Sequence, residues 1–160
     1  MPDMLVNLLK LAPCEPLLAE LRTSGVIVRR ASPHEISIVR KFVLKDFEAG
    51  WADEISVGYH NKPSSVFIAI REKKVVGFAA YECTRRGFFG PMGVAATEQG
   101  RGIGRVLLLS ALWGLREMGY AYGIIGGAGP TTFYERAVNA TVIPDSAPGV
   151  YADPIKRIDE

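Results

Sequence analysis

The stretch TEQGRGIGRVLLLSALWGL, residues 97–115, joins a glycine-rich turn directly to an apolar segment with helical spacing. Gly100, Gly102 and Gly104 occupy alternate positions of the turn, with Arg101 and Arg105 between and after them. Glycine inside a helix costs about 0.8–1.0 kcal/mol relative to alanine. In return, bare amides at a helix N-terminus approach a phosphate without Cβ clashes, and the helix dipole favours negative charge there. The stretch therefore predicts either a phosphate-binding turn or a glycine turn that binds nothing.

The spacing of these glycines disfavours two common nucleotide sites. A P-loop ends in Gly-Lys-Ser/Thr, whereas Arg105 and Val106 follow Gly104 here. A dinucleotide-binding turn has the pattern GxGxxG after the first strand of a βαβ unit, whereas this chain has GxGxG after the fourth strand that we predict. A nucleoside triphosphatase and a nicotinamide-dependent oxidoreductase are therefore the weaker hypotheses.

Length and composition are those of one globular domain with a core of its own. The chain has 160 residues, of which 48% are hydrophobic and 22% charged, and a formal net charge of +2. We expect no nucleic-acid partner, because this charge is small and the chain has no block of Lys and Arg. We expect no membrane partner either, because the apolar runs are far shorter than the roughly 20 residues of a membrane span.

The cysteines and histidines form no recognisable disulfide or metal pattern. Cys14 and Cys83 lie in unrelated contexts, which favours a reducing, cytoplasmic location. His34 and His60 are the only histidines and lack the HExxH spacing, so we expect no metal ion.

The order of apolar periodicities, prolines and glycines predicts a mixed α/β layout rather than an alternating doubly wound one. The predicted strands cover 25–31, 64–84 (a hairpin that turns at 72–74), 88–96, 120–129, 141–146 and 149–153. The predicted helices cover 34–48, 50–63, 103–119 and 130–138. We expect residues 1–24 to form a helical extension, broken at Pro13 and Pro16, that packs on a single domain of residues 25–160.

Pro91 lies inside the strand predicted over 88–96. Proline has no N–H to donate to a neighbouring strand. We therefore expect an edge, a bulge or a splayed pair of strands at this position.

The stretch VAATEQGRGIG, residues 94–104, resembles the acyl-CoA-binding motif of the GNAT superfamily of N-acetyltransferases. The family pattern is a valine, a short loop and then [Q/R]-x-x-G-x-[G/A], which falls here on Val94, Gln99, Gly102 and Gly104. A second family marker, an aromatic-Tyr-Glu triplet on the following helix, is matched by Phe133-Tyr134-Glu135. The predicted element order also agrees from residue 25 to 153. The resemblance implies a GNAT-like α+β fold in three layers, with a central, mostly antiparallel sheet flanked by helices.

Three positions depart from the family pattern. Ala96 stands where a proline is common, Gly127 lies where an asparagine is common, and Val138-Asn139 replaces a glycine. Asn139 tolerates the left-handed backbone that such a turn needs. The missing asparagine removes one expected contact to the pantetheine arm or the nearby helix.

The resemblance implies acetyl-CoA as the co-substrate. Its pyrophosphate would lie on the backbone of Gln99, Gly100, Arg101, Gly102, Ile103 and Gly104, with Arg105 beside it. The pantetheine arm would run between strands 88–95 and 120–127, where backbone groups of Met92, Gly93 and Val94 would hold it and polarise the thioester carbonyl.

The resemblance also assigns Tyr134 as the group that protonates the leaving CoA thiolate, and as a contact of the co-substrate. The alternative is an aromatic ring that only packs under its helix. For a general base the sequence offers Glu82 on the third predicted strand, where alternation places Phe78, Ala80 and Glu82 on one face. The competing interpretation of Glu82 is an exposed charge at a strand end.

Trp51 and Glu54 lie on the helix pair that forms the acceptor site in this superfamily. Residues three apart share a helix face, so both could line the cleft. A core tryptophan beside a solvated glutamate is an equal alternative. Cys83 is more typical of a small buried residue than of a nucleophile, so a covalent acyl-cysteine route has little support.

We therefore expect a cytoplasmic N-acetyltransferase that transfers an acetyl group from acetyl-CoA to a primary amine by direct transfer in a ternary complex. The acceptor is a small molecule or a protein N-terminus, and the small residues of IIGGAGPTTFY, 124–134, favour a bulky polar amine such as an amino sugar. The alternative is a catalytically silent CoA-binding sensor or regulatory domain on the same fold. The resemblance is also compatible with a homodimer.

Overall fold

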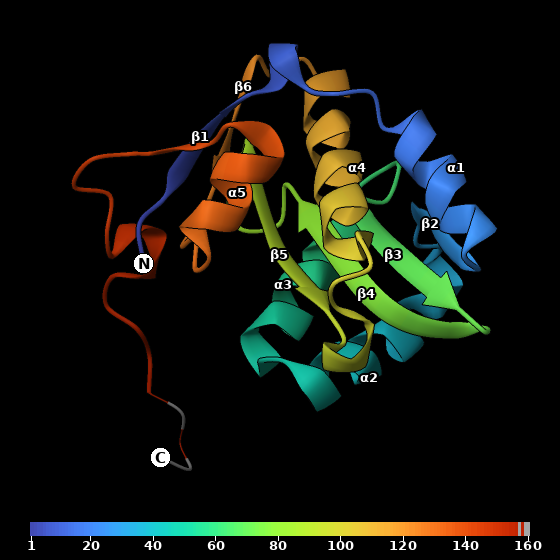
Figure 1. Cartoon of the computed structure of the whole chain (residues 1–160). Helices are drawn as coiled ribbons and strands as arrows, with labels where there is room; N and C mark the ends of the chain where they lie inside the picture. Colours follow the sequence, from blue (N-terminus) through green and yellow to red (C-terminus); the bar gives the residue numbers. More distant parts are fainter. Residues whose placement is uncertain (157, 159–160) are drawn as a thin grey trace.

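The computed structural model of the chain describes residues 1–156 and 158, and within them the strands form one seven-stranded sheet in the order β2-β3-β4-β5-β6-β1-β7 (Figure 1). All neighbouring strands pair antiparallel except β5 and β6, which pair parallel. The strands are β1 (Met4–Asn7), β2 (Val26–Arg30), β3 (Val66–Arg71), β4 (Lys74–Tyr81), β5 (Phe88–Val94), β6 (Tyr122–Ile125) and β7 (Thr141–Val142).

Helices cover both faces of this sheet, which gives the three layers that the sequence predicts. The helices are α1 (Glu15–Thr23), α2 (Ile36–Asp46), α3 (Ala49–His60), α4 (Ile103–Glu117) and α5 (Thr131–Val138). One core cluster joins α1, α4 and α5 to one face of the sheet, and a second joins α2 and α3 to the other. In β4 the alternation of side chains feeds both clusters, with Ala79 and Tyr81 in the first and Phe78 and Ala80 in the second. The α+β, GNAT-like fold class is confirmed.

Helix α4 is the central element of the first core. Its apolar residues are buried almost all round, because it lies against β4 and β5 on one side and against α1 on another. Gly102 precedes it as the N-cap, with a left-handed backbone at φ +82°. The helix thus begins at the glycine-rich turn, as the sequence predicts, and its N-terminus is held at one end of β5.

Strand β5 loses its pairing with β6 after its first two residues, and this opens the sheet. Towards β4 its register shifts by one residue between the pairs Tyr81↔Phe89 and Ala79↔Met92, which is a bulge at Gly90-Pro91. Towards β6 it pairs only through Phe88↔Ile124 and Phe89↔Ile125, after which the two strands part. The disruption predicted from Pro91 is confirmed, because a residue without an N–H cannot continue the ladder.

The N-terminal segment differs from the predicted helices. Met4–Asn7 is a strand, β1, inserted between β6 and β7. Its period is two, since Met4 and Val6 are fully buried while Leu5 is 37% exposed. A short 3₁₀ turn, Leu8–Lys10, follows, and only α1 is a helix as predicted. The helical prediction for residues 4–7 is wrong, because pairing with β6 and β7 decides the conformation of this short stretch.

The C-terminal strand pair is also absent. Residues 141–146 contribute only β7, which ends before Pro144, a residue without an N–H for the ladder. Residues 149–151 form a 3₁₀ turn instead of a strand, and Gly149 has a left-handed φ of +65°. Among the described residues, no helix combines the length and apolar character needed to cross a membrane.

Candidate active site

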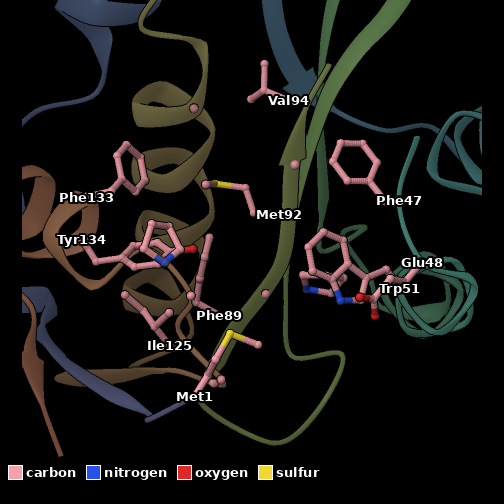
Figure 2. A pocket seen from close by; sticks show the side chains of 18 of the residues that line it. Met1, Phe47, Glu48, Trp51, Phe89, Met92, Val94, Ile125, Phe133 and Tyr134 are labelled. Atoms are coloured by element: carbon pink, nitrogen blue, oxygen red, sulfur yellow. The ribbon is translucent and has the colours of Figure 1, made fainter. Parts of the chain in front are cut away.

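A cavity of about 1010 Å³ opens where β5 and β6 part. Figure 2 shows Phe133 and Tyr134 of α5 on one side of β5, and Phe47, Glu48 and Trp51 on the other. The N-terminus of α4 closes one end, and the loop Ile125–Pro130 contributes a further wall. The lining residues thus lie on both sides of β5, and we call the side towards α4 and α5 the first compartment and the side towards α3 the second.

The glycine-rich turn lines the first compartment. The backbone of Gly100 and Gly102 is left-handed, at φ +79° and +82°, a region that other residues adopt only with strain. A Cβ at either position would meet no atom within 4 Å, so the turn faces open space. The first amides of α4 have no acceptor within the helix, and such an end has the geometry that suits an anion.

Most residues predicted to hold the co-substrate come together here. The lining set of the cavity includes Met92, Gly93, Val94, Gln99, Gly100, Gly102, Ile103, Gly104, Arg105 and Tyr134. The Gln99 side-chain amide donates to the Val94 carbonyl at 3.3 Å, which ties the turn to the end of β5.

Arg101 is the exception in the turn, because its side chain does not line the cavity. Its Nε lies 3.4 Å from the Glu98 carboxylate, which also accepts from Arg71 at 2.9 Å. The Arg101 guanidinium thus pairs with Glu98 beside the turn. Only the backbone of Arg101 remains available to a ligand at the turn.

Tyr134 stands in a largely apolar setting. It is 7% exposed, and its ring packs edge-on against Phe133 and Phe89 with centroid separations of 5.2 and 6.2 Å. Figure 2 shows its hydroxyl directed towards β5. Burial raises the pKa of Tyr134 to about 12, so the hydroxyl keeps its proton at physiological pH and can donate it.

Glu54 is the half-buried carboxylate of the second compartment. Its Oε1 accepts hydrogen bonds from the Thr84 hydroxyl at 3.1 Å and the Tyr151 hydroxyl at 3.3 Å. Burial raises the pKa of Glu54 above its ordinary value, while these two hydrogen bonds and the nearby charge of Arg85 act in the opposite direction. A carboxylate with a raised pKa in a cleft is a candidate general base.

Phe47 and Trp51 form the aromatic wall of this compartment. Their rings are stacked, with centroids 5.7 Å apart and an interplanar angle of 22°. A Cβ at Gly93 would overlap the Phe47 ring, so glycine at this position of β5 lets the wall approach the strand. Both Trp51 and Glu54 face the cavity, as one helix face requires.

The structure does not bring Glu82 to the cavity. Strand β4 ends at Tyr81, and Glu82 has a left-handed φ of +56°, so the alternation used to assign its face no longer applies. Its Oε1 accepts the Gly87 N–H, which closes the loop between β4 and β5. The geometry assigns Glu82 to this loop.

Sequence reasoning missed Tyr151, Thr84, Phe47 and Glu48 as lining residues. Tyr151 reaches Glu54 because the C-terminal segment folds back over the N-terminus. The Asp3 N–H donates to the Ser146 hydroxyl at 2.8 Å, and Asp3 Oδ1 accepts the Gly127 N–H at 2.8 Å. Nothing in the local sequence signals these long-range contacts.

Comparisons with known proteins agree with this geometry. Residues 62–137 match the family model of the acetyltransferase (GNAT) domain, a range that holds β3, β4, β5, α4, β6 and most of α5. No curated protein matches the chain in sequence.

Solved structures with the same fold are remote in sequence. A GCN5-related glucosamine N-acetyltransferase region of a fungal multi-domain GH3 β-N-acetylglucosaminidase superposes with a TM-score of 0.71 at 17% identity, over 89% of this chain and 19% of that one. A GCN5-related N-acetyltransferase from Sphaerobacter thermophilus gives 0.66 at 18% identity, over 89% of this chain and 48% of that one. This chain thus spans about a fifth and about half of their lengths.

A third structure was determined with a ligand. It is a GNAT family acetyltransferase from Brucella melitensis in complex with acetyl-CoA, with a TM-score of 0.54 at 18% identity over 74% of this chain and 86% of that one. At these identities the structural likeness establishes the fold. The glycine-rich turn and Phe133-Tyr134-Glu135 both lie within the segment that matches the GNAT acetyltransferase domain, and the chain has the GNAT fold.

Proposed function

We propose that the protein transfers an acetyl group from acetyl-CoA to a primary amine by direct transfer in a ternary complex. The observation that carries the proposal is the single cavity past β5. It connects the glycine turn, the Tyr134 hydroxyl and the Glu54 carboxylate. The candidate anion site, proton donor and base thus line the same cavity, although they lie on different elements of the fold.

The co-substrate would enter through the first compartment. Its pyrophosphate would bind the amides of the turn 99–104, where the helix dipole and the exposed Arg105 add positive potential. Its pantetheine arm would use backbone groups of Met92–Val94 that no longer pair with β6, because the two strands have parted at Phe89. The gap between β5 and β6 leaves a row of strand amides and carbonyls without a neighbouring strand.

The chemistry follows from the two titratable groups. Glu54 takes a proton from the ammonium of the acceptor, and the neutral nitrogen attacks the thioester carbonyl carbon. The carbon–sulfur bond then breaks, and Tyr134 gives its proton to the leaving thiolate. Each group is suited to its role: Glu54 accepts a proton more readily than an ordinary glutamate because burial raises its pKa, and Tyr134 is neutral and can donate.

Direct transfer is supported over a covalent acyl-enzyme. Cys83 does not line the cavity, and burial raises its pKa to about 12, so the thiol stays protonated and unreactive. Initial rates measured with both substrates varied should give intersecting reciprocal plots. Parallel plots would indicate an acyl-enzyme and contradict the ternary complex.

Tyr134→Phe is expected to lower kcat by about 10²-fold, because the thiolate then leaves without a proton donor. The affinity for acetyl-CoA should change little, since the ring remains. The measurement is thiol release at saturating acetyl-CoA, alongside calorimetric binding of CoA. Tyr59→Phe is the matched control, because the Tyr59 hydroxyl is buried, lacks a hydrogen-bond partner among the described residues and lies outside the cavity lining. Unaltered turnover in Tyr134→Phe would remove its acid role.

Tyr151→Phe is expected to move the acidic limb of the kcat/KM profile to higher pH. The hydroxyl of Tyr151 donates to Glu54 and thereby lowers the Glu54 pKa, so its removal raises that pKa. A base works only when deprotonated, and the rise of activity therefore begins at a higher pH. Tyr122→Phe, an exposed tyrosine on β6, should leave the profile unchanged. An identical profile in Tyr151→Phe would show that this hydrogen bond does not set the pKa of the base.

We also propose a cytoplasmic location. The proposal is supported by Cys14 and Cys83, which are both free thiols in the fold.

A further inference from the structure

We infer that the acceptor is a primary amine carried on an apolar body, such as an aralkylamine, rather than an amino sugar or a free amino acid. The inference rests on the proposed function, and it assigns the substrate class of the compartment next to α3. Charge, wall composition and hydrogen-bonding capacity each point to it.

The charges of the compartment select a cation. Glu48 and Glu54 line it, while Arg105, the basic residue in the described lining, lies at the other end beside α4. Arg85 is close enough to lower the pKa of Glu54, but its side chain is exposed, donates to the Thr84 carbonyl and does not line the cavity. An ammonium is thus attracted, whereas a substrate carboxylate would meet two like charges, and no Lys or Arg side chain in the described lining lies on this side of β5 to pair with it.

The walls select an apolar body. The stacked rings of Phe47 and Trp51 form one side of the compartment, and Figure 2 shows them beside Glu48 across β5 from Tyr134. The ring of Tyr151, whose hydroxyl donates to Glu54, contributes further apolar surface. Aromatic faces next to carboxylates favour an ammonium by cation–π attraction and an apolar substituent by burial.

Few hydrogen-bonding groups remain for a polyhydroxylated acceptor. The hydroxyls of Thr84 and Tyr151 both donate to Glu54 already. The sugar hydroxyls that face the Phe47 and Trp51 rings, away from the two carboxylates, would lose their water without gaining partners, which costs affinity for each group.

The small residues of 124–134 do not provide room for a bulky polar acceptor. A Cβ at Gly126 would lie 2.9 Å from the Phe88 ring, and one at Gly127 would lie 3.3 Å from the Tyr151 ring. The glycines thus make space for aromatic side chains of the chain itself. The amino-sugar expectation drawn from this stretch loses its physical basis.

The test uses 2-phenylethylamine, phenylalanine and glucosamine as acceptors, with thiol release from acetyl-CoA as the readout. Phenylalanine differs from 2-phenylethylamine only by the carboxylate. We expect kcat/KM for 2-phenylethylamine to exceed that for phenylalanine by at least about 100-fold and that for glucosamine by about tenfold or more.

Two pairs of variants link this selectivity to the walls. Glu48→Gln should narrow the ratio between 2-phenylethylamine and phenylalanine, whereas Asp46→Asn, an exposed acid nearby that does not line the cavity, should not. Trp51→Leu should narrow the ratio between 2-phenylethylamine and butylamine, because the aromatic wall is lost. Trp113→Leu is its control, since Trp113 packs against the first core cluster, donates to the Ala12 carbonyl and does not line the cavity.

The outcomes separate the inference from the proposed function. Equal or better turnover of glucosamine or phenylalanine would overturn the apolar-amine inference and leave amine acetylation intact. If acetyl-CoA binds but none of the amines is acetylated, the proposed function fails. The inference about the acceptor class is then tested by calorimetric binding of the amines to the protein–CoA complex. Tighter binding of 2-phenylethylamine than of phenylalanine supports the inference, and equal binding overturns it.

Discussion

Glu54→Gln is expected to lower kcat/KM for amine acetylation by about 10²–10⁴-fold, the range for loss of a general base. Glutamine keeps the shape of the side chain, and its oxygen can still accept from Thr84 and Tyr151, but it cannot take a proton from the acceptor. The loss should therefore fall on turnover while CoA binding is retained. The measurement is thiol release over a range of pH.

The dependence of activity on pH provides a second test of Glu54 as the base. In the unmodified protein, activity should fall as the pH drops through the Glu54 pKa, which burial holds above that of an ordinary glutamate. Glu54→Gln should lack this acidic limb. Asp53→Asn is the control, because Asp53 lies on the same helix but is exposed and pairs with Arg40 at 3.4 Å. Activity of Glu54→Gln within about twofold of the unmodified protein would exclude Glu54 as the base.

Gly102→Asp is expected to weaken CoA binding by at least about 100-fold, because a carboxylate then stands where the pyrophosphate binds. The position is the N-cap of α4 at φ +82°, and a side chain there would point into open space at the turn. Calorimetric titration with CoA is the measurement. The variant should stay folded, since aspartate is a favourable N-cap residue and an unfavourable φ costs about 1–3 kcal/mol.

Two further variants separate charge from strain. Gly25→Asp introduces the same strain at φ +84°, also in open space but outside the cavity lining, and it should leave CoA affinity unchanged. Gly102→Ala adds the Cβ without the charge and should weaken binding less than Gly102→Asp. If Gly102→Asp binds CoA as well as the unmodified protein, the assignment of the turn as the pyrophosphate site is wrong.

The parts of the fold that follow from local chemistry could be predicted from the sequence. The start of α4 at Ile103 is set by the preceding left-handed glycines, and the bulge at Pro91 by a missing N–H. The place of Tyr134 in the cavity follows from the family resemblance rather than from local chemistry, and its ring packs against Phe89 and Phe133.

The parts that depend on distant residues could not be predicted. The strand Met4–Asn7 exists because β6 and β7 offer it partners on both sides, which a local pattern of four residues does not reveal. The pKa of Glu54 depends on Thr84 and Tyr151, 30 and 97 positions away along the chain. Glu82 leaves the strand face because its own backbone is left-handed, at φ +56°.

The most direct test of amine acetylation is to incubate the protein with acetyl-CoA and a panel of primary amines, and to measure free CoA thiol and N-acetylated amine together. If the cavity past β5 works as proposed, both products form in equal amounts and only when protein and amine are present. Tight binding of acetyl-CoA with no acetylation of any amine would contradict the proposal and indicate a CoA-binding sensor instead.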